Sequence, residues 1–109
     1  MRTFLKQKPT RSESYRRWVA TTACRRCRIE GYSQAAHPNQ GRGLGQKADD
    51  LLVFALCGPR LGVNGCHIEH DRLMGMTLQE RRQRENLYIA DQQMEALQVG
   101  RPELRKEAA

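Results

Sequence analysis

Four cysteines and three histidines are the residues of this sequence best suited to chemistry. Cys24 and Cys27 are separated by two residues, a spacing that lets two thiolates of one turn reach the same tetrahedral zinc ion. Cys57 and Cys66 have eight residues between them, and the glycines and the proline of that interval would allow the chain to double back. Four thiolate ligands leave no open position on the metal. We therefore expect these cysteines to bind a structural Zn²⁺.

Other interpretations of the cysteines stay open. A redox-active pair at Cys24 and Cys27 would need a strand before it and a helix after it, and would not explain the other two cysteines. Two disulfides are disfavoured in an intracellular protein, where thiols stay reduced. Four unrelated buried cysteines are a further alternative. Their count and placement favour zinc over these three.

The histidines suggest a second metal site. His67 directly follows a cysteine, and Asp71 lies four residues later, so both side chains would share one face of a helix. One imidazole and one carboxylate, with positions left for phosphate and water, suit a catalytic Mg²⁺ or Mn²⁺. His70 is an alternative ligand to Asp71. If zinc ties the two cysteine segments together, His37 should lie at the same end of the domain as His67.

The order of these motifs resembles the HNH, or ββα-metal, nuclease family, and most closely its small phage and prophage members, some of which are linked to recombination. The resemblance covers Cys24 to about Gly75, with a following helix in the expected place. It depends on Ala36, His37 and Asn39, on Gly43, Gly45, Lys47, Ala48 and Asp50, on Leu56 and Cys57, and on Cys66, His67 and Asp71.

The resemblance implies a role for each matching residue. His37 would be the general base that takes a proton from the attacking water. Asp50 would orient His37 through a hydrogen bond, and His67 with Asp71 would hold the divalent ion that stabilises charge on the departing oxygen. Ala36 is a departure, since many members have an aspartate ligand there. That departure keeps an alternative open, a non-catalytic zinc-finger DNA-binding or recombination-accessory protein.

Charge indicates an anionic partner. Lys and Arg number 19 against 12 Asp and Glu, which gives a net charge of +7. DNA is the partner we expect, because neutralising phosphates releases condensed counterions. No apolar run is long enough to span a membrane, and no signal peptide follows Met1, so we expect a cytoplasmic protein of a bacterial host, encoded by a phage or prophage. The residues expected to contact nucleic acid are Lys47, Arg42, Asn39, Arg25 and Arg26.

The sequence predicts one small α+β domain of the ββα-metal type, stapled by zinc, with a short N-terminal helix and a longer C-terminal one. Residues 1–11 should be a flexible basic arm, 12–100 the domain and 101–109 a polar tail. Ser12 should cap a helix through Ala20. Two antiparallel strands are expected at 29–37 and 51–56, and a short helix after Cys66. Thr77 and Glu80 form a capping box for a helix to about Val99, with Leu87, Ala90, Met94 and Leu97 on its inner face.

Overall fold

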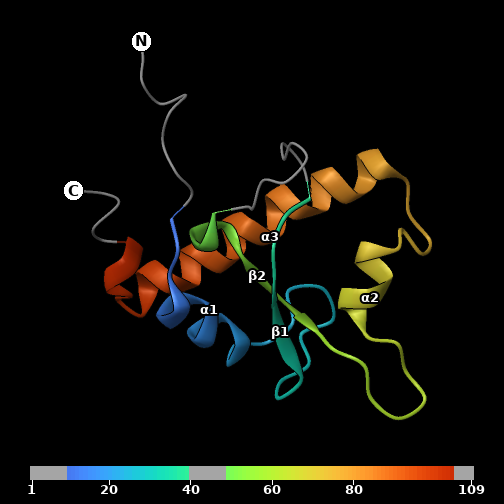
Figure 1. The fold of residues 1–109 in the computed structure, drawn as a ribbon, viewed down its shortest axis with the longest axis horizontal. Helices are drawn as coiled ribbons and strands as arrows, with labels where there is room; N and C mark the ends of the chain where they lie inside the picture. The colour runs from blue at the N-terminus through green and yellow to red at the C-terminus, as the bar shows by residue number, and fades with distance from the viewer. Residues whose placement is uncertain (1–9, 40–48, 105–109) are drawn as a thin grey trace.

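A computed structural model describes residues 10–39 and 49–104 of the chain. These residues form a small α+β fold, as the sequence predicted (Figure 1). Its elements in chain order are the helix α1 (Glu13–Ala20), the strand β1 (Ser33–Ala36), the 3₁₀ turn η2 (Asp50–Leu52), the strand β2 (Phe54–Cys57) and the helices α2 (Cys66–Asp71) and α3 (Leu78–Gln98).

The two strands pair antiparallel, with Ser33 opposite Cys57 and Ala36 opposite Phe54. Both are shorter than predicted. Gly31, with a φ of +91°, turns the chain just before β1, so the strand cannot begin at residue 29. The side chain of Asp49 accepts a hydrogen bond from the Leu51 backbone and starts η2 in place of the first part of β2.

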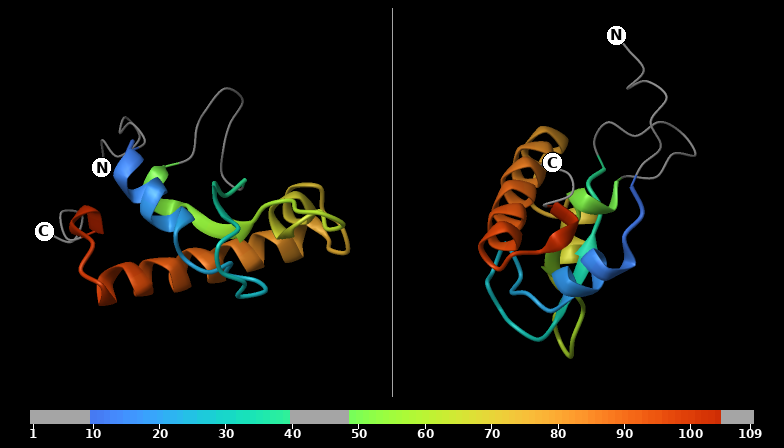
Figure 2. Two further views of the ribbon diagram at one scale, coloured as in Figure 1. Left: turned by 90° about the horizontal axis from the view of Figure 1, so that it is seen from below. Right: turned by 90° about the vertical axis from the view of Figure 1, so that its left-hand side faces the viewer.

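Helices cover the small sheet on both sides, and α3 runs beneath it along the length of the molecule (Figure 2). Two buried clusters fill the space between the layers. One joins α1 to the sheet and to the C-terminal half of α3, and contains Tyr15, Val19, Leu51, Val53, Ala55, Ala96 and Leu104. The other lies against the N-terminal half of α3 and contains Cys24, Ala36, Phe54, Leu56, Cys57 and Cys66, with Tyr88 and Ile89 beside it.

The inner face predicted for α3 was wrong. Leu87 is 69% exposed, and Ala90, Met94 and Leu97 are exposed too. The buried face carries Glu85, Gln92 and Ala96 instead. Gln92 is buried because it hydrogen-bonds the open edge of the sheet: its Oε1 accepts from the Ala55 N–H at 3.0 Å. Backbone donors at a sheet edge thus select polar residues that a hydrophobic pattern does not reveal.

The predicted arm and tail are partly built into the domain. Thr10 N–H donates to Asp49 at 3.2 Å, and Arg11 forms an ion pair with Asp50, although both residues were assigned to the arm. Leu104 is buried in the cluster that joins α1 to the sheet and to α3, although it was assigned to the polar tail. The glycine-rich stretch 41–45, with Arg42 and Lys47, lies outside the described residues. Within 10–39 and 49–104, no helix combines the length and apolar character needed to cross a bilayer.

Candidate functional site

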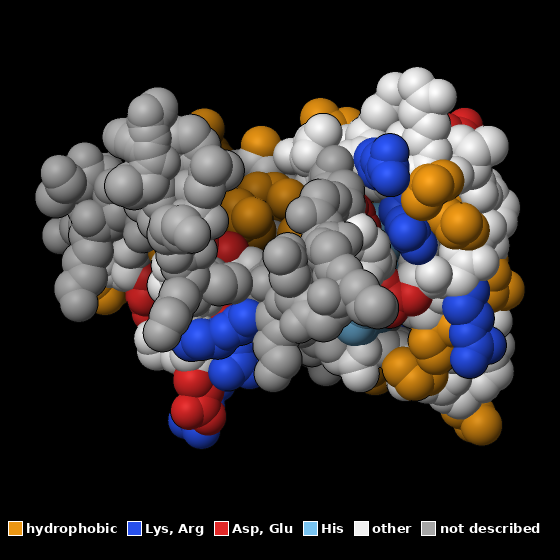
Figure 3. Space-filling model, turned by 45° about the horizontal axis from the view of Figure 1, so that its top comes forward, with side chains coloured by type: hydrophobic (Ala, Val, Ile, Leu, Met, Phe, Trp, Pro, Cys, Tyr) orange, Lys and Arg blue, Asp and Glu red, His pale blue; other side chains and the backbone are white. Residues whose placement is uncertain are grey.

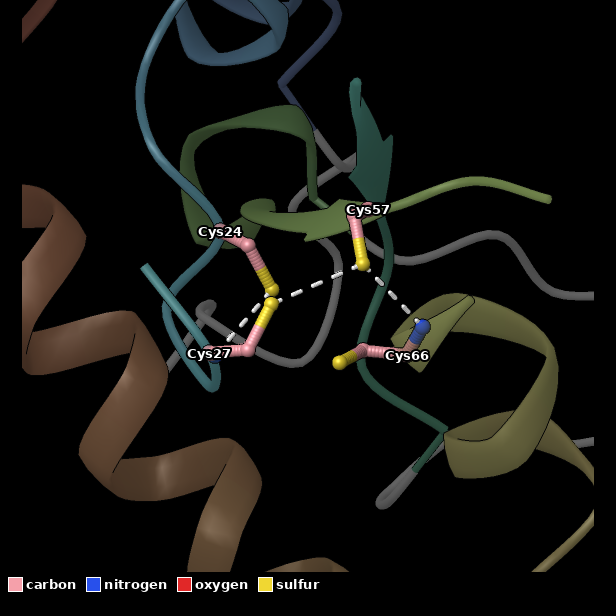
Figure 4. Close-up of side chains that lie close together, drawn as sticks. All are labelled: Cys24, Cys27, Cys57 and Cys66. Atoms are coloured by element: carbon pink, nitrogen blue, oxygen red, sulfur yellow. Dashed lines mark hydrogen bonds between the residues drawn. The ribbon is translucent and has the colours of Figure 1, made fainter. Parts of the chain in front are cut away.

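The four cysteine sulfurs converge on one volume (Figure 4). All four thiols are free, and their sulfur atoms lie within 4.8 Å of one another. The sulfurs of Cys27 and Cys57 are 3.8 Å apart. Sulfurs that share one tetrahedral zinc at 2.3 Å are separated by about 3.8 Å, so the cluster already has nearly the dimensions of a zinc site. Cys24, Cys27, Cys57 and Cys66 could therefore hold one metal ion, and a set of four thiolates suits Zn²⁺.

A tight turn brings the first pair together. The Arg28 N–H donates to the carbonyl of Cys24 at 2.9 Å, and the Cys27 N–H points to the Cys24 sulfur at 3.5 Å. Arg28 takes a left-handed φ of +68°, which reverses the chain directly after the second cysteine. Backbone N–H groups aimed at sulfur stabilise the thiolate form that a metal requires.

The second pair closes in spite of its wide spacing. Arg60 and Val63 exchange two backbone hydrogen bonds of 3.0 and 2.8 Å, which folds the loop back on itself. Gly65 then lies so close to Gly58 that an added Cβ would be only 2.4 Å from the Gly58 carbonyl oxygen. This approach, available to glycine alone, carries the chain back to β2 and places Cys66 beside Cys57. The Cys66 N–H donates to the Cys57 sulfur at 3.3 Å.

The thiols do not ionise alike. Burial acts to raise the pKa of Cys57, but hydrogen bonds from the Arg60 side chain and the Cys66 N–H outweigh it and bring this pKa to about 7. Burial raises the pKa of Cys66 and of Cys27 above the ordinary value of 9.0. Of these three thiols, Cys57 is therefore the one that most readily binds a metal as thiolate, and metal binding to Cys27 and Cys66 must displace protons.

His37 and Asp50 meet at the other end of the sheet. The His37 Nε2 lies 2.7 Å from Asp50 Oδ1, as the resemblance implied. Asp50 is only 1% exposed, and its Oδ2 accepts a 2.8 Å hydrogen bond from the Ser12 N–H. Arg16 Nε donates to the same Oδ2 at 3.0 Å, and Arg11 donates to Oδ1 at 3.1 Å. The buried carboxylate thus holds an imidazole and two guanidinium groups around it.

These contacts fix the chemistry of His37. Burial acts to raise the pKa of Asp50, but hydrogen bonds from His37, the Ser12 N–H and Arg16 outweigh it and leave this pKa below its usual 3.8. An ionised Asp50 accepts a proton-bearing Nε2, which leaves the lone pair of neutral His37 on Nδ1. A half-exposed imidazole oriented in this way is equipped to act as a general base.

The sequence reasoning missed Arg11 and Arg16. Arg11 was placed in the arm and Arg16 only in a short helix, yet both contact a carboxylate more than thirty positions away. The Asp49–Asp50 pair also holds the backbone of Thr10 and Ser12. The local signal in the sequence was two adjacent acidic residues and, far from them, several arginines around the N-cap Ser12. Spacing along the chain does not predict that these two groups of residues contact each other.

His67 and Asp71 are brought together as predicted from their spacing. The His67 Nε2 and Asp71 Oδ2 atoms are 3.4 Å apart, close to the roughly 3 Å that separates neighbouring ligands of an octahedral Mg²⁺. His67 Nδ1 contacts Gln34 Oε1 at 2.8 Å, which anchors the ring to β1. Among the described residues, no hydrogen bond or ion pair joins this pair to His37. The expected approach of His37 to His67 thus has no direct contact supporting it.

His70 has a structural setting rather than that of an alternative metal ligand. Its Nε2 lies 2.8 Å from Glu85 Oε2, and both side chains are buried. The rings of Phe54 and Tyr88 pack around it. Glu85 also accepts from the Asn39 N–H at 3.2 Å, two residues after His37. The pair therefore ties α2, α3 and the segment beyond β1 to one another.

The expected DNA contacts differ in their settings. Arg25 is buried and pairs with Asp91 and Glu95 of α3, so its assignment as a surface contact was wrong. Arg26 is exposed but forms an ion pair of 2.8 Å with Glu69. The backbone N–H of Asn39 donates a hydrogen bond to the Glu85 carboxylate. Figure 3 shows basic side chains in separate groups on one face, with acidic side chains between them.

No family model matches the chain, and neither the curated proteins nor the solved structures contain a match to it.

Proposed function

We propose that this protein is a divalent-metal-dependent DNA endonuclease of the HNH, ββα-metal type, derived from a phage or prophage and linked to recombination or DNA processing. The contact between His37 and Asp50 carries the proposal. It joins a half-exposed imidazole to a buried, ionised carboxylate at the positions where the motif resemblance expects the base and its orienting residue. The thiol cluster and the excess of basic residues support it.

In the proposed reaction, Asp50 holds His37 so that Nδ1 faces solvent and removes a proton from water. The resulting hydroxide attacks phosphorus and the 3′-oxygen leaves. A positioned base of this kind contributes about 10²–10⁴-fold. A bound Mg²⁺ or Mn²⁺ would supply charge stabilisation for the leaving oxygen, and His67 with Asp71 are the residues that would hold it. The zinc would have no part in the chemistry, since four thiolates fill its coordination sphere.

The test is cleavage of supercoiled plasmid and of single-stranded DNA across a panel of divalent metals. Wild type should nick DNA with Mg²⁺ or Mn²⁺, and His37→Ala should lose this activity while keeping its melting temperature and its zinc content. Arg17→Gln serves as the control, since Arg17 is exposed and, within residues 10–39 and 49–104, its one ion pair is with Glu13 of the same helix. Undiminished cleavage by His37→Ala would remove the mechanism.

A second function is favoured by one observation at the same site. Ala36, next to the proposed base, is buried and offers no metal ligand. A zinc-stapled DNA-binding or recombination-accessory protein that lost catalysis would retain the rest of the structure. It predicts salt-sensitive DNA binding that His37→Ala leaves unchanged, with no cleavage at any metal concentration.

A further inference from the structure

We infer that Arg16, supported by Arg11, forms a binding site for a single phosphodiester group beside His37. This inference deepens the proposed function, because it names the residues that would hold the scissile phosphate next to the base. The site follows from how Asp50 distributes its hydrogen bonds among its neighbours.

Cationic groups surround the carboxylate of Asp50. The guanidinium groups of Arg11 and Arg16 both contact this buried carboxylate, and His37 contacts it as well. The side chain of Asp50 is 1% exposed, whereas those of Arg16, Arg11 and His37 are 41%, 47% and 32% exposed. Solvent therefore meets the cationic groups and the imidazole while the carboxylate lies beneath them. An anion approaching this surface meets the two guanidinium groups before it meets the carboxylate.

Arg16 is fixed at one end and open at the other. Its Nε donates to Asp50 at 3.0 Å, and among the described residues its two terminal amino groups have no hydrogen-bond partner. A guanidinium fork held in this way has already lost part of its side-chain freedom, so binding an anion costs less entropy. The planar fork matches two oxygens of a phosphate group.

The same carboxylate holds the fork and the base. His37 contacts Oδ1 of Asp50 and Arg16 contacts Oδ2, so both side chains are anchored to one buried group. A phosphodiester bound by the Arg16 amino groups would thus lie within reach of a water on His37 Nδ1. As His37 takes up a proton, the site gains further positive charge where negative charge builds up on phosphorus.

A purely structural role for Arg16 predicts something different. Arg11 by itself would neutralise Asp50, and the Ser12 N–H and His37 supply further donors. On that account only the Nε–H of Arg16 matters. The substitution Arg16→Gln separates the two roles, because the glutamine amide nitrogen occupies the same bond position as Nε. Gln can keep the hydrogen bond to Asp50 but lacks the terminal amino groups and the charge.

The experiment compares Arg16→Gln with Arg17→Gln in the full, zinc-loaded chain. Arg17 is the next residue of α1, is 78% exposed and pairs with Glu13. Arg17→Gln therefore removes one positive charge, as Arg16→Gln does, but from a side chain that does not contact Asp50. The probes are inorganic phosphate and a ten-nucleotide oligothymidylate, titrated into ¹⁵N-labelled protein. The His37 ring and Arg16 Nε–H resonances should shift in wild type. Affinity for the oligonucleotide should fall about tenfold or more in Arg16→Gln, the loss expected for a charge-assisted contact, and less than threefold in Arg17→Gln.

The outcomes separate this inference from the proposed function, since binding is measured without cleavage. A wild type that binds through Arg16 but never cleaves DNA would end the proposed function and leave the phosphate site standing. A wild type that cleaves DNA while Arg16→Gln binds as tightly as wild type would end the phosphate site alone. Equal losses in the two variants would also contradict it, as would the absence of any shift at His37.

Discussion

The two ends of the small sheet carry different sets of side chains. Where Ser33 pairs with Cys57, four thiols of one kind converge, and three of them are buried. Where Ala36 pairs with Phe54, the chain leads into His37, and an imidazole, a carboxylate and two guanidinium groups meet. The first set is uniform and closed. The second is mixed in charge, and its outer members are exposed to solvent.

This difference indicates a division of labour within a domain that has a small apolar core. A closed set of identical soft ligands is suited to stabilising a fold through a metal and has no vacancy for a substrate. A mixed set around one buried carboxylate is costly to assemble and exposes groups that can transfer protons and bind anions. The two strands are the rigid connection that lets the first end hold the second in place.

The largest expected effect is loss of the metal at the cysteine end. Structural zinc sites contribute on the order of 10 kcal/mol, as much as the whole stability of a typical domain. Chelation, or Cys57→Ser, should therefore unfold the protein, as judged by circular dichroism, and abolish the hydrogen-exchange protection of the Ala55 N–H. Elemental analysis should give one zinc per chain before treatment and none afterwards.

The control for this experiment is chelator already saturated with zinc, which should change nothing. A metal-free protein that kept its melting temperature would show that the thiols pack without a metal. A titratable low-pKa pair at Cys24 and Cys27 in such a protein would favour the redox interpretation instead.

The next effect concerns the histidine end. Asp50→Asn should lower DNA cleavage about 10²–10⁴-fold, because an amide can donate to His37 Nε2, reverse its tautomer and leave no lone pair on Nδ1. Zinc content should not change. Asp49→Asn is the matched control, since the asparagine oxygen can still cap η2 and only the acceptor for the Thr10 N–H is lost. Comparable losses in both variants would mean that the acidic pair only supports the backbone.

Much of this arrangement could be predicted from the sequence. The two-residue gap between Cys24 and Cys27 determined the turn, and the Thr77–Glu80 capping box forms as expected. Spacing by four residues placed Asp71 beside His67. Each of these features depends on residues close together in the chain, where local geometry leaves few choices.

The remainder depended on contacts between distant segments. Arg16 and Asp50 are 34 residues apart, and no pattern in the sequence pairs them. The buried face of α3 was missed for the same reason. Glu85 and Gln92 are polar, yet they are buried because backbone N–H groups of Asn39 and Ala55 need acceptors there. Hydrophobic periodicity does not take these hydrogen bonds into account. It therefore predicted a buried face containing Leu87 and Met94, which are exposed.

A smaller effect should come from the connection between the two ends. Glu85→Ala would remove the acceptor of the buried His70 ring and of the half-buried Asn39 N–H, which should cost about 3 kcal/mol of unfolding free energy. Urea denaturation of the zinc-loaded protein measures this loss. Leu87→Ala, on the exposed face of the same helix, should change stability by less than about 0.5 kcal/mol. A null result for Glu85→Ala would mean that this buried network does not hold the segment after His37.

The smallest expected effect is a difference in acid stability. The pKa of Asp50 is lowered in the folded protein, so its ionised form favours folding above the unfolded value near 3.8. This contribution should be constant from pH 5 to 8 and should be lost as the pH falls below about 4 through the folded pKa. Because acid also releases metal from thiolates, zinc must be followed separately with a chromogenic chelator. Wild type should lose its stability advantage over Asp50→Asn only in the acid range. If that advantage instead disappeared between pH 5 and 8, Asp50 would have to protonate there, and it could not hold His37 in the tautomer that a base at neutral pH requires.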